Sequence, residues 1–529
     1  MAGLTVASCR MQRNAPYNHL MSGVPGFTTA ALHRARLSRD ARFDGKFFIA
    51  VLSTRIYCRP ICPSPRCKRS NVVFYATAAS AEAAGYRPCR RCRPEVAPGS
   101  PAWLGPSAVV RRALRLIQEG TLDDGTVEDL ATRVGLGARH LSRLFVEHVG
   151  VSPIAVAITR RLHFSKQLID ETSWPVTRVA MASGFRSLRR FNEAYRDAFG
   201  CSPRESRRGR GAGGAPARED QVALTLAYRP PYDWPGLCHF LRQRAVTGVE
   251  QVHTHSYART VRLEHGHALI RVTPIEGRHS LRLEVARAPS GHLFEVATAA
   301  RRMFDLSADP AQIAEVLAID PLLSYRVRTA PGLRIPGIWD PFECAVRAVL
   351  GENIDRAATQ RLLGQLVERC GEALVEPHAG LTHLFPDARH LAAANLDGLG
   401  LSSPTISALR AVAEAVLAGA TGFTSPAETL ARALATLPQI GEKAAQYVIL
   451  RGLPEPDALP LTDGVIARLF ETEGEPSAEA VDERTQSWRP WRGYAALHLS
   501  RGANSARGAH RQTRMSGRKT AGSAHETAR

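Results

Sequence analysis

The stretch YCRPICPSPRCKRSNVVFYATAASAEAAGYRPCRRCRPE, residues 57–95, contains two close pairs of cysteines. Three residues separate Cys58 from Cys62, and two residues separate Cys89 from Cys92. Two such pairs in one short segment can supply four thiolates to a single tetrahedral zinc ion. The spacing therefore predicts a Zn²⁺ site with these four cysteines as ligands, around which a small domain folds.

Basic side chains surround this cluster, and a fifth cysteine, Cys67, lies within it. The basic residues are Arg55, Arg59, Arg66, Lys68, Arg69, Arg87, Arg90, Arg91 and Arg93. A zinc-bound thiolate stays deprotonated and nucleophilic at neutral pH. The site can therefore be purely structural, or one thiolate can attack an electrophile that the basic surface brings close. We expect Cys67 to be a bystander, because the other four cysteines satisfy zinc.

The overall charge of the chain indicates a polyanionic partner. The 529-residue chain has 69 Lys and Arg against 49 Asp and Glu, a formal net charge of +20. Nucleic acid is the expected polyanion, because neutralising phosphates releases counterions. A membrane surface is the alternative, but no apolar stretch approaches the ~20 residues that a spanning helix needs. With no signal peptide at the N-terminus, we expect a cytoplasmic protein without membrane contact.

Composition and periodicity divide the chain into several parts. We expect a multidomain protein, mainly α with α+β parts. The expected segments are an irregular N-terminus (1–26), a small zinc-binding α/β domain (27–97), a paired helix-turn-helix bundle (101–206), a Gly/Ala/Arg linker (207–221), a small α/β domain with alternating strands (222–328), a helical domain (329–500) and a basic disordered tail (501–529).

Residues 126–153 and 174–203 each predict a helix, a glycine-containing turn and a second helix. Each copy ends in Ser-Pro, which we expect to close the unit. Gly135 and Gly184 stand where the turn needs a small or left-handed residue. The second helices should expose basic side chains that can contact guanine edges or phosphates, namely Arg139, His140, Arg143, Arg186, Arg189 and Arg190. The alternative is a plain helical bundle with solvated arginines.

Four motifs give residues 40–95 a specific resemblance. FDGKF (43–47), YCRPIC (57–62), NVVFY (71–75) and AAGYRPCRRCRP (83–94) resemble the N-terminal domain of the Ada adaptive-response family. The resemblance implies that Cys58 accepts a methyl group from a DNA methylphosphotriester, once per molecule. Losing one negative charge at the zinc site would reduce repulsion of phosphate and tighten DNA binding. Residues 101–206 resemble the AraC-type regulator domain, which follows the zinc domain in the Ada family.

Residues 222–500 resemble the AlkA-type alkylbase DNA glycosylases. The matching blocks are LAYRPPYDWPGLCHFLRQRAVTGVEQV (226–252), DPFECAVRAVLGENID (340–355), LPQIGEKAAQYVILRG (437–452) and SWRPWRGYAALHL (487–499). The resemblance implies a small TBP-like α/β domain followed by an all-α helix-hairpin-helix glycosylase domain that needs no metal. Gln439, Ile440 and Gly441 would form the hairpin that presents backbone N–H groups to a DNA phosphate.

Asp463 follows this hairpin. Alone, an aspartate before a helix predicts an N-cap. The resemblance instead implies that Asp463 assists loss of a flipped base, by stabilising charge at C1′ or activating water. Tyr447 and Trp491 are the residues expected in the base pocket.

Several positions depart from the AlkA pattern. Gln439 stands where the family usually has glycine, Glu352 and Asn353 where it has two glutamines, and Ser500 where it has an aromatic residue that helps to hold the base. Lys443 stands where the family has tryptophan. Endonuclease III-like bifunctional glycosylases carry lysine there. The favoured interpretation of Lys443 is a surface lysine near phosphate, and the alternative hypothesis is AP-lyase activity that uses Lys443 with Asp463.

The preferred interpretation is a fused bacterial alkylation-response protein that binds double-stranded, especially alkylated, DNA. It would repair methylphosphotriesters, excise alkylated purines such as 3-methyladenine, and act as a nucleoid-associated monomer that contacts RNA polymerase if it activates transcription. One alternative is a transcription regulator with an inactive glycosylase-like DNA clamp. Another keeps the zinc site purely structural. No PCHR-like segment occurs, so no O6-alkylguanine acceptor is predicted.

Overall fold

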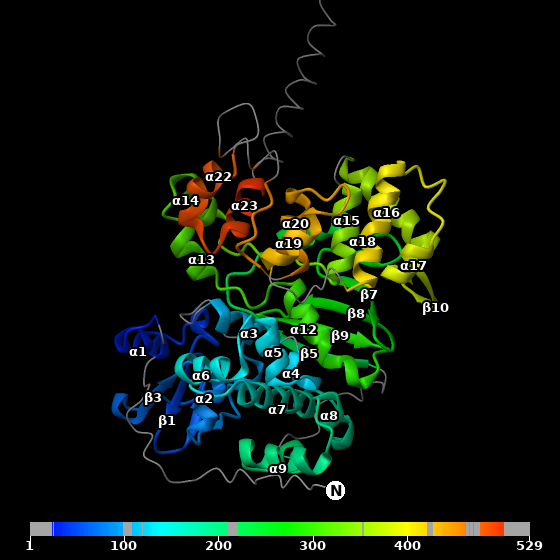
Figure 1. Ribbon diagram of the computed structural model, residues 1–529. Helices are drawn as coiled ribbons and strands as arrows, with labels where there is room; N and C mark the ends of the chain where they lie inside the picture. Colours follow the sequence, from blue (N-terminus) through cyan, green and yellow to red (C-terminus); the bar gives the residue numbers. More distant parts are fainter. Residues whose placement is uncertain are drawn as a thin grey trace, which may run out of the picture.

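The computed structural model describes most of the chain between Val24 and Arg501. The described residues are 24, 26–98, 108–118, 120–208, 221–351, 354–419, 427–453, 455–461, 465, 469 and 477–501. The predictions for Glu352, Asn353, Asp463, residues 1–23 and the tail beyond 501 lie outside this range. The fold is multidomain and rich in helices, with small sheets, as predicted (Figure 1).

The zinc-binding part contains a four-stranded sheet in the order β3-β1-β2-β4. Strand β1 pairs antiparallel with β2 and β3, and β4 runs parallel to β2. Short helices and two small apolar clusters, one on Phe47 and Phe74 and one on Phe48 and Tyr57, complete it. Its elements are α1 (Thr29–Ser38), η1 (Ala41–Phe43), β1 (Phe48–Val51), β2 (Ile56–Cys58), η2 (Arg69–Asn71), β3 (Val72–Tyr75), α2 (Ala78–Ala83), β4 (Arg87–Pro88) and η3 (Pro94–Val96).

The regulator part consists of two helix-turn-helix units joined by the long helix α7. Its elements are α3 (Ala108–Gln118), α4 (Thr121–Asp124), α5 (Val127–Arg133), α6 (Ala138–Val149), α7 (Pro153–Glu171), α8 (Val176–Ala182), α9 (Leu188–Phe199) and α10 (Pro203–Arg208). The Ser-Pro pairs begin helices rather than only closing units. Ser152 caps α7 by accepting from the Ala155 amide at 3.3 Å, with Pro153 in the first turn, where its missing N–H costs nothing.

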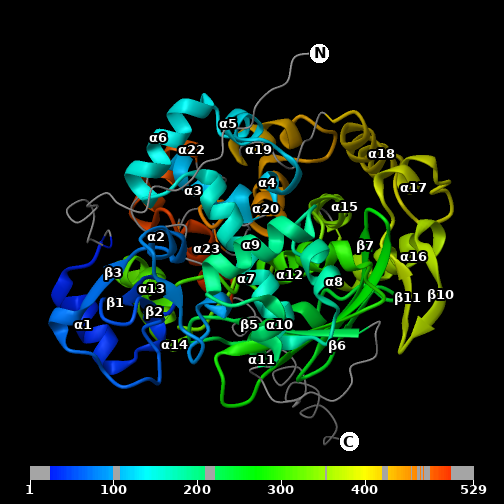
Figure 2. The same cartoon turned by 90° about the horizontal axis from the view of Figure 1, so that it is seen from below.

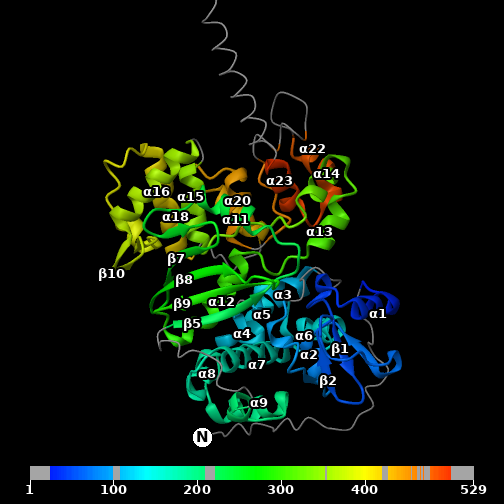
Figure 3. The same cartoon turned by 180° about the vertical axis from the view of Figure 1, so that it is seen from behind.

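The third part is a five-stranded antiparallel sheet in the order β5-β9-β8-β7-β6 with helices packed on it (Figure 3). Alternating burial along β9, with Leu281, Leu283 and Val285 buried, reflects the alternating sequence pattern that predicted strands here. Its elements are β5 (Gln221–Ala227), α11 (Trp234–Arg242), β6 (Glu250–Val252), β7 (Tyr257–Leu263), β8 (Gly266–Pro274), β9 (Ser280–Ala286), η4 (Ser290–His292) and α12 (Leu293–Met303).

The C-terminal part is helical around one large core that contains Trp488 and Trp491. It also contains a feature absent from the all-α expectation, the antiparallel hairpin of β10 and β11, which sits against β7. Its elements are α13 (Pro310–Leu317), α14 (Pro321–Thr329), α15 (Pro341–Gly351), α16 (Arg356–Cys370), β10 (Glu372–His378), β11 (Leu381–Leu384), α17 (Ala388–Ala393), α18 (Ser403–Leu417), α19 (Ala427–Ala435), α20 (Glu442–Gly452), α22 (Ala478–Thr485), η5 (Gln486–Trp488) and α23 (Arg492–Arg501).

Helix α7 lies between the zinc-binding part and the five-stranded sheet, as the view from below shows (Figure 2). The regulator helices α7–α9 share one hydrophobic core with this sheet and α12. Within it, Phe164 of α7 meets Phe294 of α12 edge-on, with ring centroids 4.6 Å apart, and the Arg160 guanidinium lies 3.9 Å from the Phe294 centroid. The second helix-turn-helix unit is therefore docked on the sheet.

Buried polar contacts join the zinc-binding part to the third and C-terminal parts. Lys46 forms an ion pair with Asp309, and both side chains are almost fully buried. Arg229, which has no exposed surface, donates from Nε to the Asp44 carbonyl oxygen at 2.9 Å and from Nη1 to that of Ser307 at 2.8 Å. Isolated buried charges are costly, so these paired groups define one arrangement of the parts.

Among the described residues, no single helix has the length and apolar character to cross a membrane. One bent pair, α6 with α7, passes by length and composition alone.

Candidate metal centre and DNA-binding surfaces

The four predicted cysteines converge at the end of β2. Cys58 is the last residue of β2, Cys62 follows in the next turn, and Cys89 and Cys92 lie in the loop after β4. Their four Sγ atoms all lie within 4.8 Å of one another, and the Cys62 and Cys89 sulfurs are 3.9 Å apart. Tetrahedral zinc with Zn–S bonds near 2.3 Å requires sulfurs about 3.8 Å apart. The cluster therefore fits one Zn²⁺ ion.

Exposure distinguishes the ligands. Cys89 and Cys92 are buried, whereas Cys58 and Cys62 are half-buried. Cys67 is not a member of the four-sulfur group, and the backbone oxygen of Cys67 accepts from Arg36 Nη1 at 3.0 Å.

Arg59 links the two halves of the cluster. Its amide donates to Cys92 Sγ at 3.3 Å, and its guanidinium donates to the Cys92 carbonyl oxygen at 3.0 Å. The same guanidinium forms a buried ion pair with Asp44, with Nε 2.8 Å from Oδ1. Hydrogen bonds to ligands orient them and tune the metal, so Arg59 gives the centre an outer layer of support.

The second helices of the two helix-turn-helix units, α6 and α9, are the predicted recognition helices, and they repeat the same burial pattern. Leu141, Phe145 and Val149 of α6 are buried, as are Phe191, Tyr195 and Phe199 at the same spacing in α9. Both preceding turns contain a glycine with positive φ, at +75° for Gly135 and +78° for Gly184, as predicted. The six predicted DNA-contact residues are all exposed, namely Arg139, His140, Arg143, Arg186, Arg189 and Arg190. They lie on α6, at the start of α9 and in the turn before α9.

The predicted hairpin connects α19 to α20. Gly441 is the N-cap of α20 and is exposed, and no side chain among the described residues caps the helix. The first amides of α20 are thus available to a phosphate. Ile440 is only 2% exposed, because its side chain is part of the core, so its contribution to such a site is its backbone. Lys443 is exposed on the first turn of α20.

Gln439 adopts the left-handed conformation, with φ of +57°. This conformation is costly for any residue except glycine, which explains physically why glycine suits this hairpin position. The Gln439 side chain is exposed, and its Oε1 accepts from Thr405 Oγ1 of α18 at 3.5 Å.

The two residues predicted for the base pocket lie in different surroundings. Trp491 is 2% exposed in the core, with its ring centroid 5.9 Å from that of Tyr494. Tyr447 is half-buried, and its hydroxyl accepts from Arg451 one turn further along α20. Ser500 is half-buried, and its hydroxyl donates to the Ala496 carbonyl oxygen at 2.8 Å within α23.

Sequence reasoning missed the neighbours of Tyr447. The Arg451 guanidinium lies 5.2 Å from the Tyr447 centroid and 4.8 Å from that of Phe240 in α11. The Arg244 guanidinium also lies over the Phe240 ring, 3.7 Å from the ring centroid. Burial lowers the pKa of Arg244 to about 10, and the positive charges of Arg451 and Arg356 contribute to this shift. Phe240 and Arg244 are distant in sequence from the hairpin, so no spacing signal could have grouped them with Tyr447 and Arg451.

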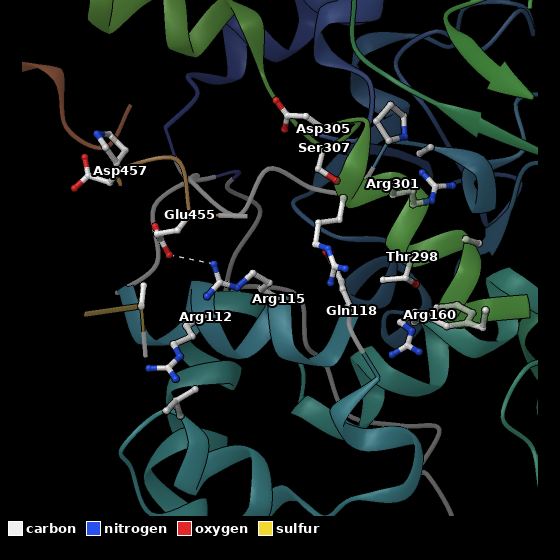
Figure 4. Close-up of a pocket in the computed structure, with 18 of the residues that line it drawn as sticks. Arg112, Arg115, Gln118, Arg160, Thr298, Arg301, Asp305, Ser307, Glu455 and Asp457 are labelled. Carbon is white, nitrogen blue, oxygen red and sulfur yellow. Dashed lines mark hydrogen bonds and ion pairs between the residues drawn. The ribbon is translucent and has the colours of Figure 1, made fainter. Parts of the chain in front are cut away.

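A cavity of about 800 Å³ lies between the zinc-binding, regulator, sheet and C-terminal parts (Figure 4). Arg115 of α3 faces Glu455, with Arg115 Nη1 3.1 Å from Glu455 Oε2, and Arg112 and Asp457 also line the cavity. Burial lowers the pKa of Arg301, which also lines the cavity, to about 10. Neither Tyr447 nor Trp491 is among its lining residues, so this cavity is separate from the predicted base pocket.

Three family models match the chain. Residues 31–95 match the metal binding domain of Ada, residues 130–209 a helix-turn-helix domain, and residues 223–340 the AlkA N-terminal domain.

Relatives match across the same parts. The chain is 39% identical over 480 residues, 88% of its length and 95% of the other, to a probable bifunctional transcriptional activator/DNA repair enzyme AlkA of Mycobacterium tuberculosis. It is 33% identical to DNA-3-methyladenine glycosylase 2 of Escherichia coli, over 52% of this chain and 95% of that protein. It is 34% identical to the bifunctional transcriptional activator/DNA repair enzyme Ada of Escherichia coli, over 33% of this chain and 47% of that protein.

Replacing Gln439 with glycine is expected to stabilise the C-terminal part. A left-handed backbone costs an L-residue roughly 1–2 kcal/mol, which glycine avoids. Glycine also loses more entropy on folding, so we expect the free energy of unfolding to rise by about 0.5–1 kcal/mol. Urea denaturation followed by tryptophan fluorescence measures the change. Gln439→Ala is the control, because alanine retains the strain, and equal stability of the two variants would contradict the explanation.

Proposed function

The chain belongs to the family of AlkA-type bifunctional transcriptional activators and DNA repair enzymes, and we propose that Cys58 and Asp463 perform its two repair reactions. The protein has a zinc domain, a helix-turn-helix domain and a glycosylase domain, and it binds DNA. The first reaction is supported by the four-sulfur cluster. In it, the half-buried Cys58 ends β2, and the exposed Arg90 and Arg91 lie between Cys89 and Cys92.

In the first reaction, the Cys58 sulfur attacks the methyl carbon of a DNA methylphosphotriester. A sulfur–carbon bond forms while the carbon–oxygen bond of the ester breaks, and its electron pair remains on the phosphate as an ordinary phosphodiester. Bound zinc keeps the cysteine thiolates deprotonated at neutral pH. Cys62, Cys89 and Cys92 remain zinc ligands after the transfer. Arg59 stabilises the cluster through the hydrogen bond from its amide to Cys92 Sγ.

The reaction also changes the charge of the surface that meets DNA. The thioether of methylated Cys58 is neutral, so the cluster loses one negative charge. Repulsion of the phosphate backbone falls accordingly, and the methylated protein binds DNA more tightly. The exposed arginines of α6 and α9 supply contacts to bases and phosphates for sequence-directed binding.

Cys58→Ser is expected to abolish methyl acceptance. Full-length zinc-loaded protein is incubated with methylated DNA, and intact mass spectrometry detects the gain of one methyl group in the parent and its absence in the variant. Cys67→Ser is the matched control and should gain the methyl group. Zinc content and circular dichroism report whether Cys58→Ser remains folded. No methyl gain in the parent would instead support a purely structural zinc site.

In the second reaction, the C-terminal part removes an alkylated purine such as 3-methyladenine from DNA. The uncapped N-terminus of α20 holds a backbone phosphate, and the base is flipped out of the stack towards the region of Tyr447. Asp463 stabilises charge developing at C1′ or activates the attacking water. The match to a DNA-3-methyladenine glycosylase along 95% of its length supports this assignment.

Asp463→Asn is expected to lower the rate of base excision at least about 100-fold, the lower range for removal of a general acid or base. A duplex with one 3-methyladenine measures excision, and DNA affinity should stay unchanged because asparagine keeps the shape of aspartate. Release of no base by the parent would favour the alternative, a regulator whose glycosylase-like part is an inactive DNA clamp.

A second candidate activity is AP lyase with Lys443 as nucleophile. The observation in favour is that Lys443 is exposed on the first turn of α20, one turn before Tyr447. Its amine would form a Schiff base at C1′ of an abasic site. Borohydride trapping on abasic-site DNA should then give a covalent adduct that Lys443→Ala lacks. Absence of the adduct in the parent would exclude this activity and leave Lys443 as a phosphate contact.

The wider setting follows from these activities. We propose that the protein acts as a monomer on double-stranded DNA in the bacterial nucleoid and contacts RNA polymerase when it activates transcription. The support is the pair of exposed recognition helices in a single chain that also carries both repair sites.

A further inference from the structure

Three of the four zinc ligands have a chain neighbour that contacts the regulator part. Tyr57 precedes Cys58, Arg90 follows Cys89, and Arg93 follows Cys92. Each of these neighbours reaches α7 or the turn after α9. The metal centre is therefore tied to the regulator part through the segments that carry its ligands.

The contact beside Cys58 is a partly buried polar network around Glu82 of α2. Tyr57 has no exposed surface, and its hydroxyl donates to Glu82 Oε1 at 2.8 Å. From α7, Thr159 Oγ1 donates to Glu82 Oε2 at 2.8 Å, and His163 Nε2 lies 2.8 Å from Oε1. Burial lowers the pKa of His163, but the charge of Glu82 and its hydrogen bond outweigh burial and raise the pKa above its usual value.

The loop with Cys89 and Cys92 has its own ties to the regulator part. Arg93 lies 3.5 Å from Asp170 Oδ2 and 3.3 Å from Glu171 Oε1, both on α7. Arg90 Nη2 donates to Cys201 Sγ, in the turn after α9, at 3.3 Å. The two ligand-bearing segments thus contact the regulator part independently.

Tyr57 connects this network to the metal centre. Its carbonyl oxygen accepts from the Cys89 amide at 2.9 Å, and its ring packs edge-on against Phe48, with centroids 5.6 Å apart. The next residue is Cys58. A shift of Glu82 or α7 therefore moves the strand end that carries the acceptor sulfur, because the buried tyrosine has no free space in which to adjust.

We propose that Glu82 is a positioning residue for Cys58, and that its contacts with Thr159 and His163 make methyl acceptance depend on the docking of α7. The inference rests on the proposed methyl-acceptor function.

Thr159→Val tests this coupling without altering any residue of the zinc-binding part. It removes the hydroxyl that donates to Glu82 and keeps the shape of the side chain. At saturating methylated DNA, we expect its rate of methyl gain to fall about 10-fold, within the usual range of coupling energies, with full zinc content and unchanged DNA concentration at half-saturation. Thr132→Val, on α5, is the matched control and should react at the parent rate.

A double variant distinguishes coupling from general loss of stability. Glu82→Ala should slow methyl gain, and adding Thr159→Val should slow it no further, because Glu82→Ala already removes the acceptor of the Thr159 hydroxyl. If Thr159→Val gains the methyl group at the parent rate, or if the two effects add in the double variant, the inference is overturned and the proposed function stays intact. No methyl gain in the parent would overturn both.

Discussion

The convergence of four cysteine sulfurs on one zinc ion is the constraint on which the N-terminal part depends. This part has only two small apolar clusters, and small domains of that kind need a metal or a covalent link to hold a fold. The centre also supports structure beyond itself. Arg59 joins the Cys92 loop to Asp44, and the Asp44 carbonyl oxygen accepts from the buried Arg229 of the sheet-containing part.

The parts are fused more closely than their sequence spacing suggests. A Gly/Ala/Arg linker is predicted at 207–221, between the regulator part and the sheet. The structure instead gives α7–α9 and the sheet a common hydrophobic core, with Phe164 against Phe294. One consequence is that α7 contacts the zinc-binding part as well as the sheet.

Local patterns predicted the features that depend on neighbouring residues. Cysteine spacing identified the zinc ligands, because chelation by paired residues needs only a short loop. Gly135 and Gly184 marked the left-handed turns, since glycine adopts positive φ without strain. Resemblance to glycosylases identified the hairpin, yet it could not explain the departure at Gln439. The backbone shows only why glycine suits that position, because it has a positive φ and any side chain there is strained.

The sequence by itself determined the zinc centre, the paired helix-turn-helix units and the DNA-directed character of the chain, since spacing, periodicity and charge are local or additive properties. Only the tertiary structure decided which side chains meet across the parts. Glu82 joins Tyr57 to Thr159 and His163, and Phe240 lies beside Arg244 and Arg451 near Tyr447. Such groupings arise from packing between segments distant in the chain, where no sequence period records the contact.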